Sequence, residues 1–367
     1  MFEILESLRE TYETATLVVF AAFGLGILFG VIAEISKYCM RAAVAEWATP
    51  SQDEVPARYR TGLISFAILA ALIGTQAMHF SGLIDLSESI YWSVPIRPLP
   101  LIVGGLLFGI GMVLTGGCVS RLLVLAASGN ARAVVSILVT GIAAYATLRG
   151  ILALPRIELE NLIASDVTPA TLFAGNSSLI SIFFGLVLVL TVAVVFSSRN
   201  RGLARAALPG TAIGLLVVLG WFITGVVGLD EFEPTQLTSL SFVAPIAESV
   251  QYLMIYTGDT IRFSIALVGG VLVGAFLSAA ISGRFSFQGF VNERSILRYL
   301  AGAVLMGFGG VTALGCTVGQ GVTGLSTVAP SSLISLAAIL VGSFVTMKIQ
   351  ATRRQQGDAV SSLIPAE

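Results

Sequence analysis

Long apolar runs separated by short polar segments extend along the whole chain. A helix that crosses a bilayer needs roughly 17–25 residues. About nine runs reach that working length: 15–35, 61–80, 99–115, 132–150, 178–198, 206–227, 262–282, 297–314 and 332–349. The third and eighth runs are short, and each leads into a glycine-rich stretch that contains a cysteine. The pattern predicts an all-α polytopic membrane protein whose residues 1–367 form a single membrane-embedded domain.

Two of the polar connections are long. Residues 228–261 contain an apolar stretch framed by Pro245 and Gly258, and proline near a helix start with glycine past its end is a typical helix signature. This stretch is too short to span and too apolar for a solvated loop, so we expect a re-entrant or interfacial helix. Residues 151–177, which contain Pro155 and Pro169, are expected to be irregular.

Composition narrows the class of protein further. Hydrophobic residues make up 56% and charged residues 11% of the chain, whereas soluble domains carry about 25% charge. No basic tract indicates nucleic-acid binding. One histidine and three cysteines without a CxxC motif argue against a catalytic triad, a disulfide framework or a metal site. The chain lacks a phosphate-binding loop and the common hydrolase motifs, so we expect neither an enzyme nor a bound cofactor.

The basic residues are distributed unevenly between the two sets of alternating loops. One set holds Arg9, Arg97, Arg149, Arg156 and Arg262, and the other holds the rest of the 20 lysines and arginines. Cytoplasmic loops are enriched in these residues. The N-terminus is therefore predicted outside and the C-terminus in the cytoplasm. The acidic segment Met1–Thr16 is unlike a signal peptide, so the first run is predicted to be retained as a span.

Two segments of the chain repeat each other. Residues 99–150 resemble residues 297–349, because Gly104, Leu107, Gly109, Gly111, Gly117 and Cys118 recur 198 positions later as Gly302, Leu305, Gly307, Gly309, Gly315 and Cys316. The third predicted span thus corresponds to the eighth, five spans later, and this odd separation inverts the second copy in the bilayer. Inverted repeats around broken helices place the substrate sites of many secondary transporters near the membrane midplane. The repeat therefore favours a transport pathway over a catalytic pocket.

Each of the three cysteines lies where a predicted helix is interrupted. A helix that begins after such a break directs its backbone N–H groups and positive dipole end at a ligand, and glycine lets that ligand approach closely. Arginines follow two of the cysteines, which favours an anion. The candidate pathway residues are Cys39, Cys118, Cys316, Gly117, Gly315, Lys37, Arg41 and Arg121.

Simpler interpretations exist for most of these residues. A lone cysteine in a span is usually a small buried hydrophobe, and Lys37, Arg41 and Arg121 also fit ordinary positive-inside anchors. The matched positions of Cys118 and Cys316 favour a substrate role, whereas Cys39 has no counterpart in the sixth span. Elsewhere, Tyr91 and Trp92 are interpreted as an outer aromatic belt, Trp221 as packing, and Glu34 as an interfacial carboxylate with a weak claim to proton transfer.

The cysteine segments resemble the YeeE/YedE sulfur-transport family of bacterial permeases over about residues 20–345. The matching residues are Lys37 to Ala42, Gly116 to Cys118, Leu314 to Cys316 with Gly319 and Gly324, and Phe242 to Gly258 leading into Phe263 and Gly269-Gly270. The resemblance implies an hourglass-shaped inner-membrane protein with re-entrant loops, thiosulfate as cargo, a path lined by the three cysteines, and a cytosolic sulfur carrier of the TusA type as partner. Val119, Ser120 and Arg121 depart from the smaller residues of many members, and related members move other sulfur or selenium species.

The chemistry of thiosulfate fits such a path. The ion is a dianion with a soft terminal sulfur, to which a neutral thiol can donate a weak S–H hydrogen bond. Several weak sites in series let an ion enter and still leave. Two alternatives stay open: a membrane sulfurtransferase that passes sulfur as a cysteine persulfide to a cytosolic carrier, and a structural or assembly subunit.

Overall fold

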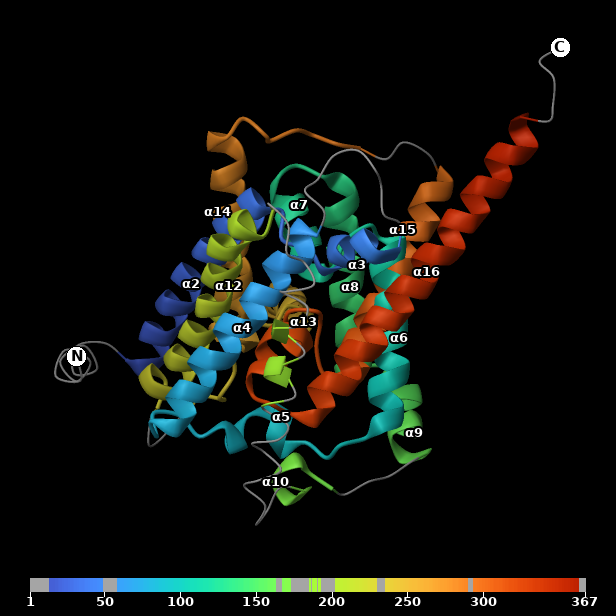
Figure 1. Ribbon diagram of the computed structural model, residues 1–367. Helices are drawn as coiled ribbons and strands as arrows, with labels where there is room; N and C mark the ends of the chain where they lie inside the picture. The colour runs from blue at the N-terminus through green and yellow to red at the C-terminus, as the bar shows by residue number, and fades with distance from the viewer. Residues whose placement is uncertain are drawn as a thin grey trace.

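The computed structural model is a bundle of helices (Figure 1). It describes residues 13–48, 58–162, 167–172, 185, 187–189, 191–192, 202–229, 235–289 and 293–362. Within these residues, extended pairing is limited to one isolated bridge between Asn130 and Gln288. The longer helices are α2 (Thr14–Ser36), α4 (Tyr59–Phe80), α6 (Pro98–Leu114), α8 (Ala131–Arg149), α12 (Gly202–Phe222, followed by the π-helical turn Ile223–Val227), α14 (Phe263–Ile281), α15 (Glu293–Thr312) and α16 (Pro330–Ser362).

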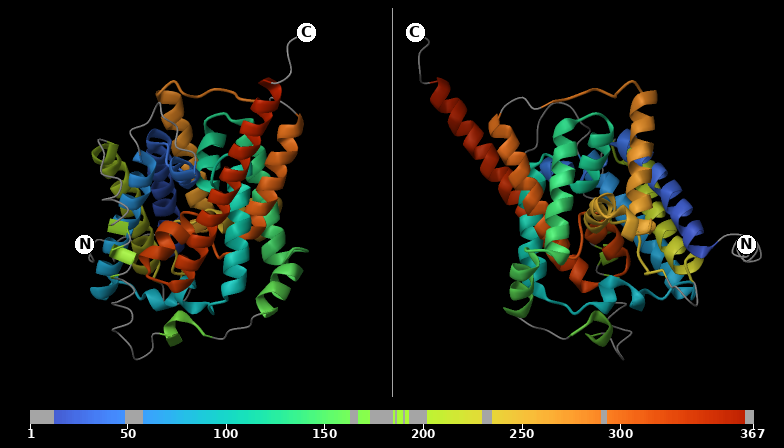
Figure 2. Two further views of the ribbon diagram at one scale, coloured as in Figure 1. Left: turned by 45° about the vertical axis from the view of Figure 1, so that its right-hand side comes forward. Right: turned by 180° about the vertical axis from the view of Figure 1, so that it is seen from behind.

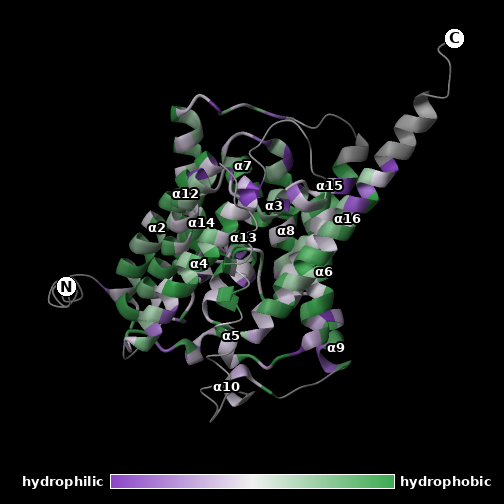
Figure 3. Cartoon of the chain, in the orientation of Figure 1, coloured by the Kyte–Doolittle hydropathy of each residue, from purple (hydrophilic) through white to green (hydrophobic). Residues whose placement is uncertain are grey.

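Seven helical segments of the described chain are long and apolar enough to cross a bilayer: Thr14–Ala48, Tyr59–Phe80, Pro98–Ala127, Ala131–Arg149, Ala204–Val227, Phe263–Ile281 and Pro330–Arg353. A shorter apolar helix covers Ile296–Thr312. The expected all-α, multi-pass membrane fold is confirmed, and Figure 3 shows its hydrophobic residues along the helices, with hydrophilic residues gathered near α7, α16 and α9 at the two ends. The predicted span 178–198 lies outside the described residues except at six positions. The total of nine spans stays a prediction.

Shorter segments connect or interrupt the long helices. They are α3 (Met40–Ala48), η1 (Leu86–Glu88), α5 (Ile90–Ser93), α7 (Val119–Ala127), α9 (Ala153–Leu162), α10 (Pro169–Leu172), α13 (Val243–Met254), η3 (Tyr256–Gly258) and the π-helical η4 (Gly319–Gly324). The short helix expected between residues 228 and 261 is confirmed as α13, and the view from behind in Figure 2 shows it inside the bundle, where it packs against α8 and α14. The irregular structure expected for residues 151–177 was wrong for 153–162 and 169–172, where α9 and α10 form, and nine residues of that segment (163–166 and 173–177) lie outside the described chain. Pro155 and Pro169 lie within the first turns of these helices, where proline is tolerated.

The helices α6 and α15, which carry the repeated sequence, run in opposite directions and pack against each other (Figure 1). Their backbones approach at glycines. A β-carbon on Gly111 would lie 2.5 Å from the Gly302 carbonyl oxygen, and one on Gly309 would lie 2.5 Å from the Gly104 carbonyl oxygen. The reverse approaches, Gly302 to Gly111 and Gly104 to Gly309, are both 2.9 Å. Gly104 corresponds to Gly302 and Gly111 to Gly309 in the repeat, so exchanging the two copies leaves the contact unchanged.

The other helix pairs follow the same rule. Helix α2 packs along α14 and α12 packs along α4, while α6 packs along α16 and α15 along α8. In the predicted repeat, α2 corresponds to α12, α4 to α14, α6 to α15 and α8 to α16. Under this correspondence the α2–α14 pair becomes the α12–α4 pair, and the α6–α16 pair becomes the α15–α8 pair. The packing therefore agrees with the inverted repeat predicted from the sequence, and it leaves the interrupted segments around α3, α7, α13 and η4 inside the bundle.

Candidate functional site

The three cysteines are buried, and none forms a disulfide. Each of them immediately precedes a helical turn and provides the carbonyl that accepts its first hydrogen bond. These bonds come from Ala43 N to Cys39 O (3.2 Å), from Leu122 N to Cys118 O (2.9 Å) and from Gln320 N to Cys316 O (2.7 Å). Each thiol thus lies at the N-terminal side of a helical segment, as the sequence predicted.

The first interruption lies between α2 and α3. Lys37 ends α2 in the left-handed conformation (φ 55°), and the N–H groups of Lys37 and Tyr38 both donate to the Ala33 carbonyl. This turn exposes Lys37 and buries Tyr38 and Cys39. Arg41 lies in the first turn of α3, and its buried Nε atom has no hydrogen-bond partner among the described residues.

The second interruption lies between α6 and α7. Gly116 has a φ of 83°, a conformation that favours glycine, and Gly117 and Cys118 follow it into α7. A β-carbon on Gly117 would make ordinary contact, 3.5 Å from Arg121 Cγ, so the backbone requirement for glycine falls on Gly116. The Cys118 Sγ atom lies 3.3 Å from Ser120 Oγ. Arg121 is half-buried, and its Nη1 atom has no partner within the described part of the chain.

The third interruption follows α15. Gly315 has a φ of 155°, and a β-carbon there would lie 3.2 Å from Gln320 Cγ, so a side chain would be strained. Cys316 comes next, and the Gly319 N–H donates to its Sγ atom at 3.4 Å. The Gln320 side chain donates to the Ala313 carbonyl at 2.7 Å. These bonds fix the cysteine before the π-helical segment η4.

Side chains from other helices hold this third segment in place. The Tyr91 hydroxyl donates to the Gly319 carbonyl at 2.6 Å, the Trp92 Nε1–H to Thr327 O at 2.9 Å, and Gln76 Nε2 to Ser326 O at 2.8 Å. Burial raises the pKa of Tyr91 far above its usual value, so the hydroxyl stays protonated and can donate. The aromatic-belt interpretation of Tyr91 and Trp92 was therefore wrong.

The three interruptions converge. The Cys118 thiol lies beside the Cys39 thiol and the Thr317 side chain, and the Tyr38 hydroxyl is within electrostatic range of all three cysteines. Aromatic rings pack beside Tyr38, since the centroid of the Phe29 ring lies 6.3 Å from that of Tyr38 and 5.0 Å from that of Phe242. Tyr38 and Thr317 were not predicted as site residues, although each is the direct neighbour of a cysteine.

The charged candidates lie around this group rather than in it. Arg41 and Arg121 lie in the first turns of α3 and α7, and these helices lie toward the same end of the bundle in Figure 1. Lys37 is exposed at the end of α2. Glu34 is buried and forms an ion pair with Arg284, which argues against a role in proton transfer. Within the described residues no group of three or more His, Cys, Asp or Glu side chains is arranged to hold a metal ion.

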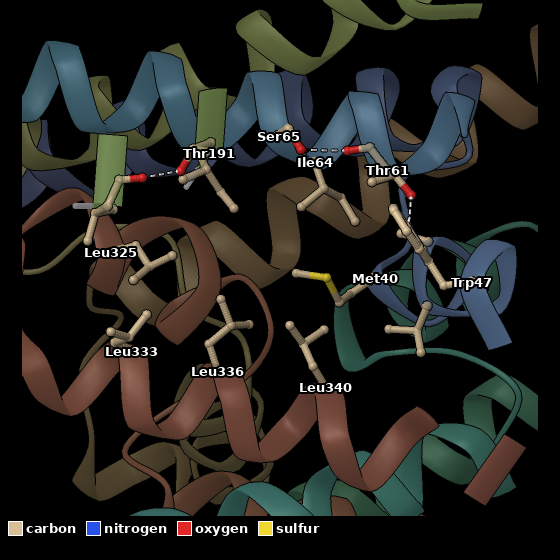
Figure 4. Close-up of a pocket in the computed structure, with 14 residues that line it drawn as sticks. Met40, Trp47, Thr61, Ile64, Ser65, Thr191, Leu325, Leu333, Leu336 and Leu340 are labelled. Carbon is tan, nitrogen blue, oxygen red and sulfur yellow. Dashed lines mark hydrogen bonds between the residues drawn. The ribbon is translucent and has the colours of Figure 1, made fainter. Parts of the chain in front are cut away.

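A separate cavity of about 340 Å³ lies between α3, α4 and α16. Figure 4 shows Met40, Leu336 and Leu340 lining it. Its hydroxyl groups are already bonded: Thr61 to Glu46, Ser65 to the Thr61 carbonyl and Thr191 to the Val187 carbonyl. The cavity therefore offers an anion no free polar group, and we do not assign it to the pathway.

A multi-pass helical protein with inward-facing, cysteine-containing interruptions has the organisation of a membrane transporter rather than of an enzyme. The sulphur transport family model matches residues 35–345, and the chain belongs to this family. The chain is 25% identical over 333 residues to the thiosulfate transporter TsuA of Spirochaeta thermophila, covering 87% of this chain and 95% of that protein. It is 23% identical to the thiosulfate transporter TsuA of Escherichia coli, covering 86% and 90%.

Proposed function

We propose that this protein carries thiosulfate across the bacterial inner membrane into the cytoplasm, along a path formed by Cys39, Cys118 and Cys316. The observation that carries this proposal is the convergence of three buried, unpaired thiols, each at the N-terminal side of a helical turn. The names of both relatives support the same cargo.

The environment of the thiols suits a soft dianion. Moving an anion out of water is costly unless donors replace its hydration. The N-termini of α3 and α7 supply oriented N–H groups and positive dipole ends. The thiols add weak S–H donors that match the terminal sulfur and bind it loosely enough for release.

The two copies of the repeat differ in their charged residues. Arg121 in the first copy corresponds to Gly319 in the second, whose carbonyl is held by Tyr91. Cationic side chains therefore accumulate beyond Cys39 and Cys118, at the end of the bundle that holds α3 and α7. We propose that this end faces the cytoplasm and that Arg41, Arg121 and Lys37 draw the anion toward it. A TusA-type sulfur carrier would receive the cargo there, an assignment that rests on the family resemblance.

Uptake by proteoliposomes tests the proposal. The purified protein is reconstituted, and entry of thiosulfate labelled separately on its two sulfur atoms is followed. We expect both labels to enter together and in equal amounts, whereas a variant with all three cysteines replaced by alanine should show no uptake. Entry of one label without the other would instead support a persulfide-forming sulfurtransferase, and no uptake by the wild type would refute the proposed cargo.

The proposed orientation has its own test. A tag at Met1 should be accessible to a protease outside intact spheroplasts, and a tag at Glu367 should become accessible only after lysis. The opposite pattern would place the Arg41 and Arg121 end outside and contradict the direction of transport.

A further inference from the structure

Two buried hydroxyl groups near the thiols have no hydrogen-bond partner among the described residues: Tyr38 Oη and Thr317 Oγ1. Both residues are 1% exposed. Buried polar groups are nearly always hydrogen-bonded in folded proteins, because an unmade bond destabilises the structure. Two unpartnered hydroxyls near the thiols therefore indicate that something else completes their bonding.

Both hydroxyls lie near the cysteine thiols. Tyr38 lies within electrostatic range of all three thiols, and Thr317 lies beside the Cys118 thiol. Thr317 comes from the third interruption and Tyr38 from the first, so the two donors approach the thiols from different segments. By contrast, the Tyr91 hydroxyl already has a partner, because it donates to Gly319 O.

The two kinds of donor differ chemically. A hydroxyl is a strong donor to a hard oxygen acceptor, whereas a thiol is a weak donor. Thiosulfate carries both kinds of acceptor, with oxygens at one end and a terminal sulfur at the other. A site with hydroxyls beside thiols can bind both ends at once.

We propose that Tyr38 Oη and Thr317 Oγ1 form an oxyanion subsite that holds the sulfonate oxygens while the Cys118 thiol faces the terminal sulfur. This inference rests on the proposed thiosulfate transport and extends it. It identifies Tyr38 and Thr317 as residues that select a cargo with an oxyanion group. Reduced sulfur species without oxygen atoms would gain nothing from them.

The subsite is tested with Tyr38→Phe and Thr317→Val, which remove the hydroxyls and keep the shapes of the side chains. A hydrogen bond to a charged ligand contributes enough that each variant should raise the KM for thiosulfate uptake at least about tenfold. Thr317→Ser, which keeps a hydroxyl, should stay close to the wild type. Ser136→Ala is the matched control, because Ser136 Oγ is also buried and unpartnered in the described structure but lies on α8.

Stabilisation of the detergent-solubilised protein by thiosulfate gives a second measurement that does not depend on transport. The concentration of thiosulfate needed to raise the melting temperature should increase in Tyr38→Phe and Thr317→Val, and not in Ser136→Ala. If the wild type takes up thiosulfate and both variants keep its KM and its thermal response, the oxyanion subsite is refuted while the proposed function stands. If the wild type neither takes up thiosulfate nor responds to it, both are refuted.

Discussion

Glu34 Oε2 lies 2.6 Å from Arg284 Nη2, and this ion pair joins the last turn of α2 to the residues that follow α14. The same carboxylate oxygen accepts a hydrogen bond from Ser278 Oγ at 3.0 Å. Glu34 is 8% exposed, whereas Arg284 is 42% exposed. The pair therefore fixes the end of α2 directly before the turn that presents Cys39.

Replacing Arg284 by alanine should destabilise the protein, because it leaves a buried carboxylate with Ser278 as its remaining donor. Solvent around Arg284 reduces the effect below that of a fully buried pair, so we expect a loss of about 1–3 kcal/mol. The melting temperature in detergent should fall accordingly. Glu34→Gln, which removes the buried charge, should be milder, and an Arg284→Ala protein as stable as the wild type would contradict the structural role of the pair.

Cys118→Ala and Cys316→Ala should each abolish or strongly reduce thiosulfate uptake. Both thiols are fully buried in equivalent positions of the repeat, and alanine removes the sulfur with little change in volume. Initial uptake rates are compared at equal membrane abundance and after checking the melting temperature of each variant. Cys39→Ala should also impair uptake, because its thiol lies beside Cys118. If Cys118→Ala and Cys316→Ala took up thiosulfate at the wild-type rate, these thiols would not belong to the path.

Cys118→Ser separates hydrogen bonding from covalent sulfur chemistry. Serine keeps a small donor, so uptake should be partial and higher than in Cys118→Ala if the thiol only donates a hydrogen bond. A persulfide mechanism needs the sulfur itself, and serine would then be as inactive as alanine. Mass spectrometry of the wild type after exposure to thiosulfate completes the comparison. A persulfide on Cys39 or Cys118 together with an inactive serine variant would contradict passage of the intact anion.

Gly111→Ala and Gly309→Ala, which alter corresponding positions of the two copies, should destabilise the protein by similar amounts. Each added β-carbon would lie within 3 Å of a backbone oxygen on the opposite helix, so α6 and α15 must move apart, at a cost of about 1–3 kcal/mol. Gly24→Ala is the control, because a β-carbon there would meet nothing within 4 Å. Thermal unfolding in detergent should show two comparable losses and an unchanged or slightly more stable control. Unequal losses would argue against an equivalent role for the two glycines.

The sequence was sufficient for the features that depend on local patterns. Apolar length predicted the seven spanning helices of the described chain, and the pairing of Pro245 with Gly258 predicted a short helix that the structure has as α13. The spacing of 198 residues matched Gly111 with Gly309, and the structure gives each of them a glycine of the opposite helix as its contact.

Contacts between distant segments could not be predicted in the same way. Tyr91 is of a residue type that is common at membrane interfaces, but its hydroxyl donates to the carbonyl of Gly319, 228 positions away in the sequence. Tyr38 is separated from Thr317 by most of the chain, and both lie near the thiols because the segments that follow α2 and α15 converge there. Local sequence does not predict such contacts between distant residues, because they depend on how the helices pack.

The glycine crossing of α6 and α15 also bears on the history of the chain. Gly111 meets Gly302 in the same geometry in which Gly309 meets Gly104, so the two helices contact each other through corresponding glycines. A half-length ancestor with this helix could have formed the same contact with a second molecule inserted the opposite way up. Gene duplication and fusion would then have joined two oppositely oriented partners into one polypeptide, after which Arg121 and Gly319 were free to diverge and give the pathway a direction.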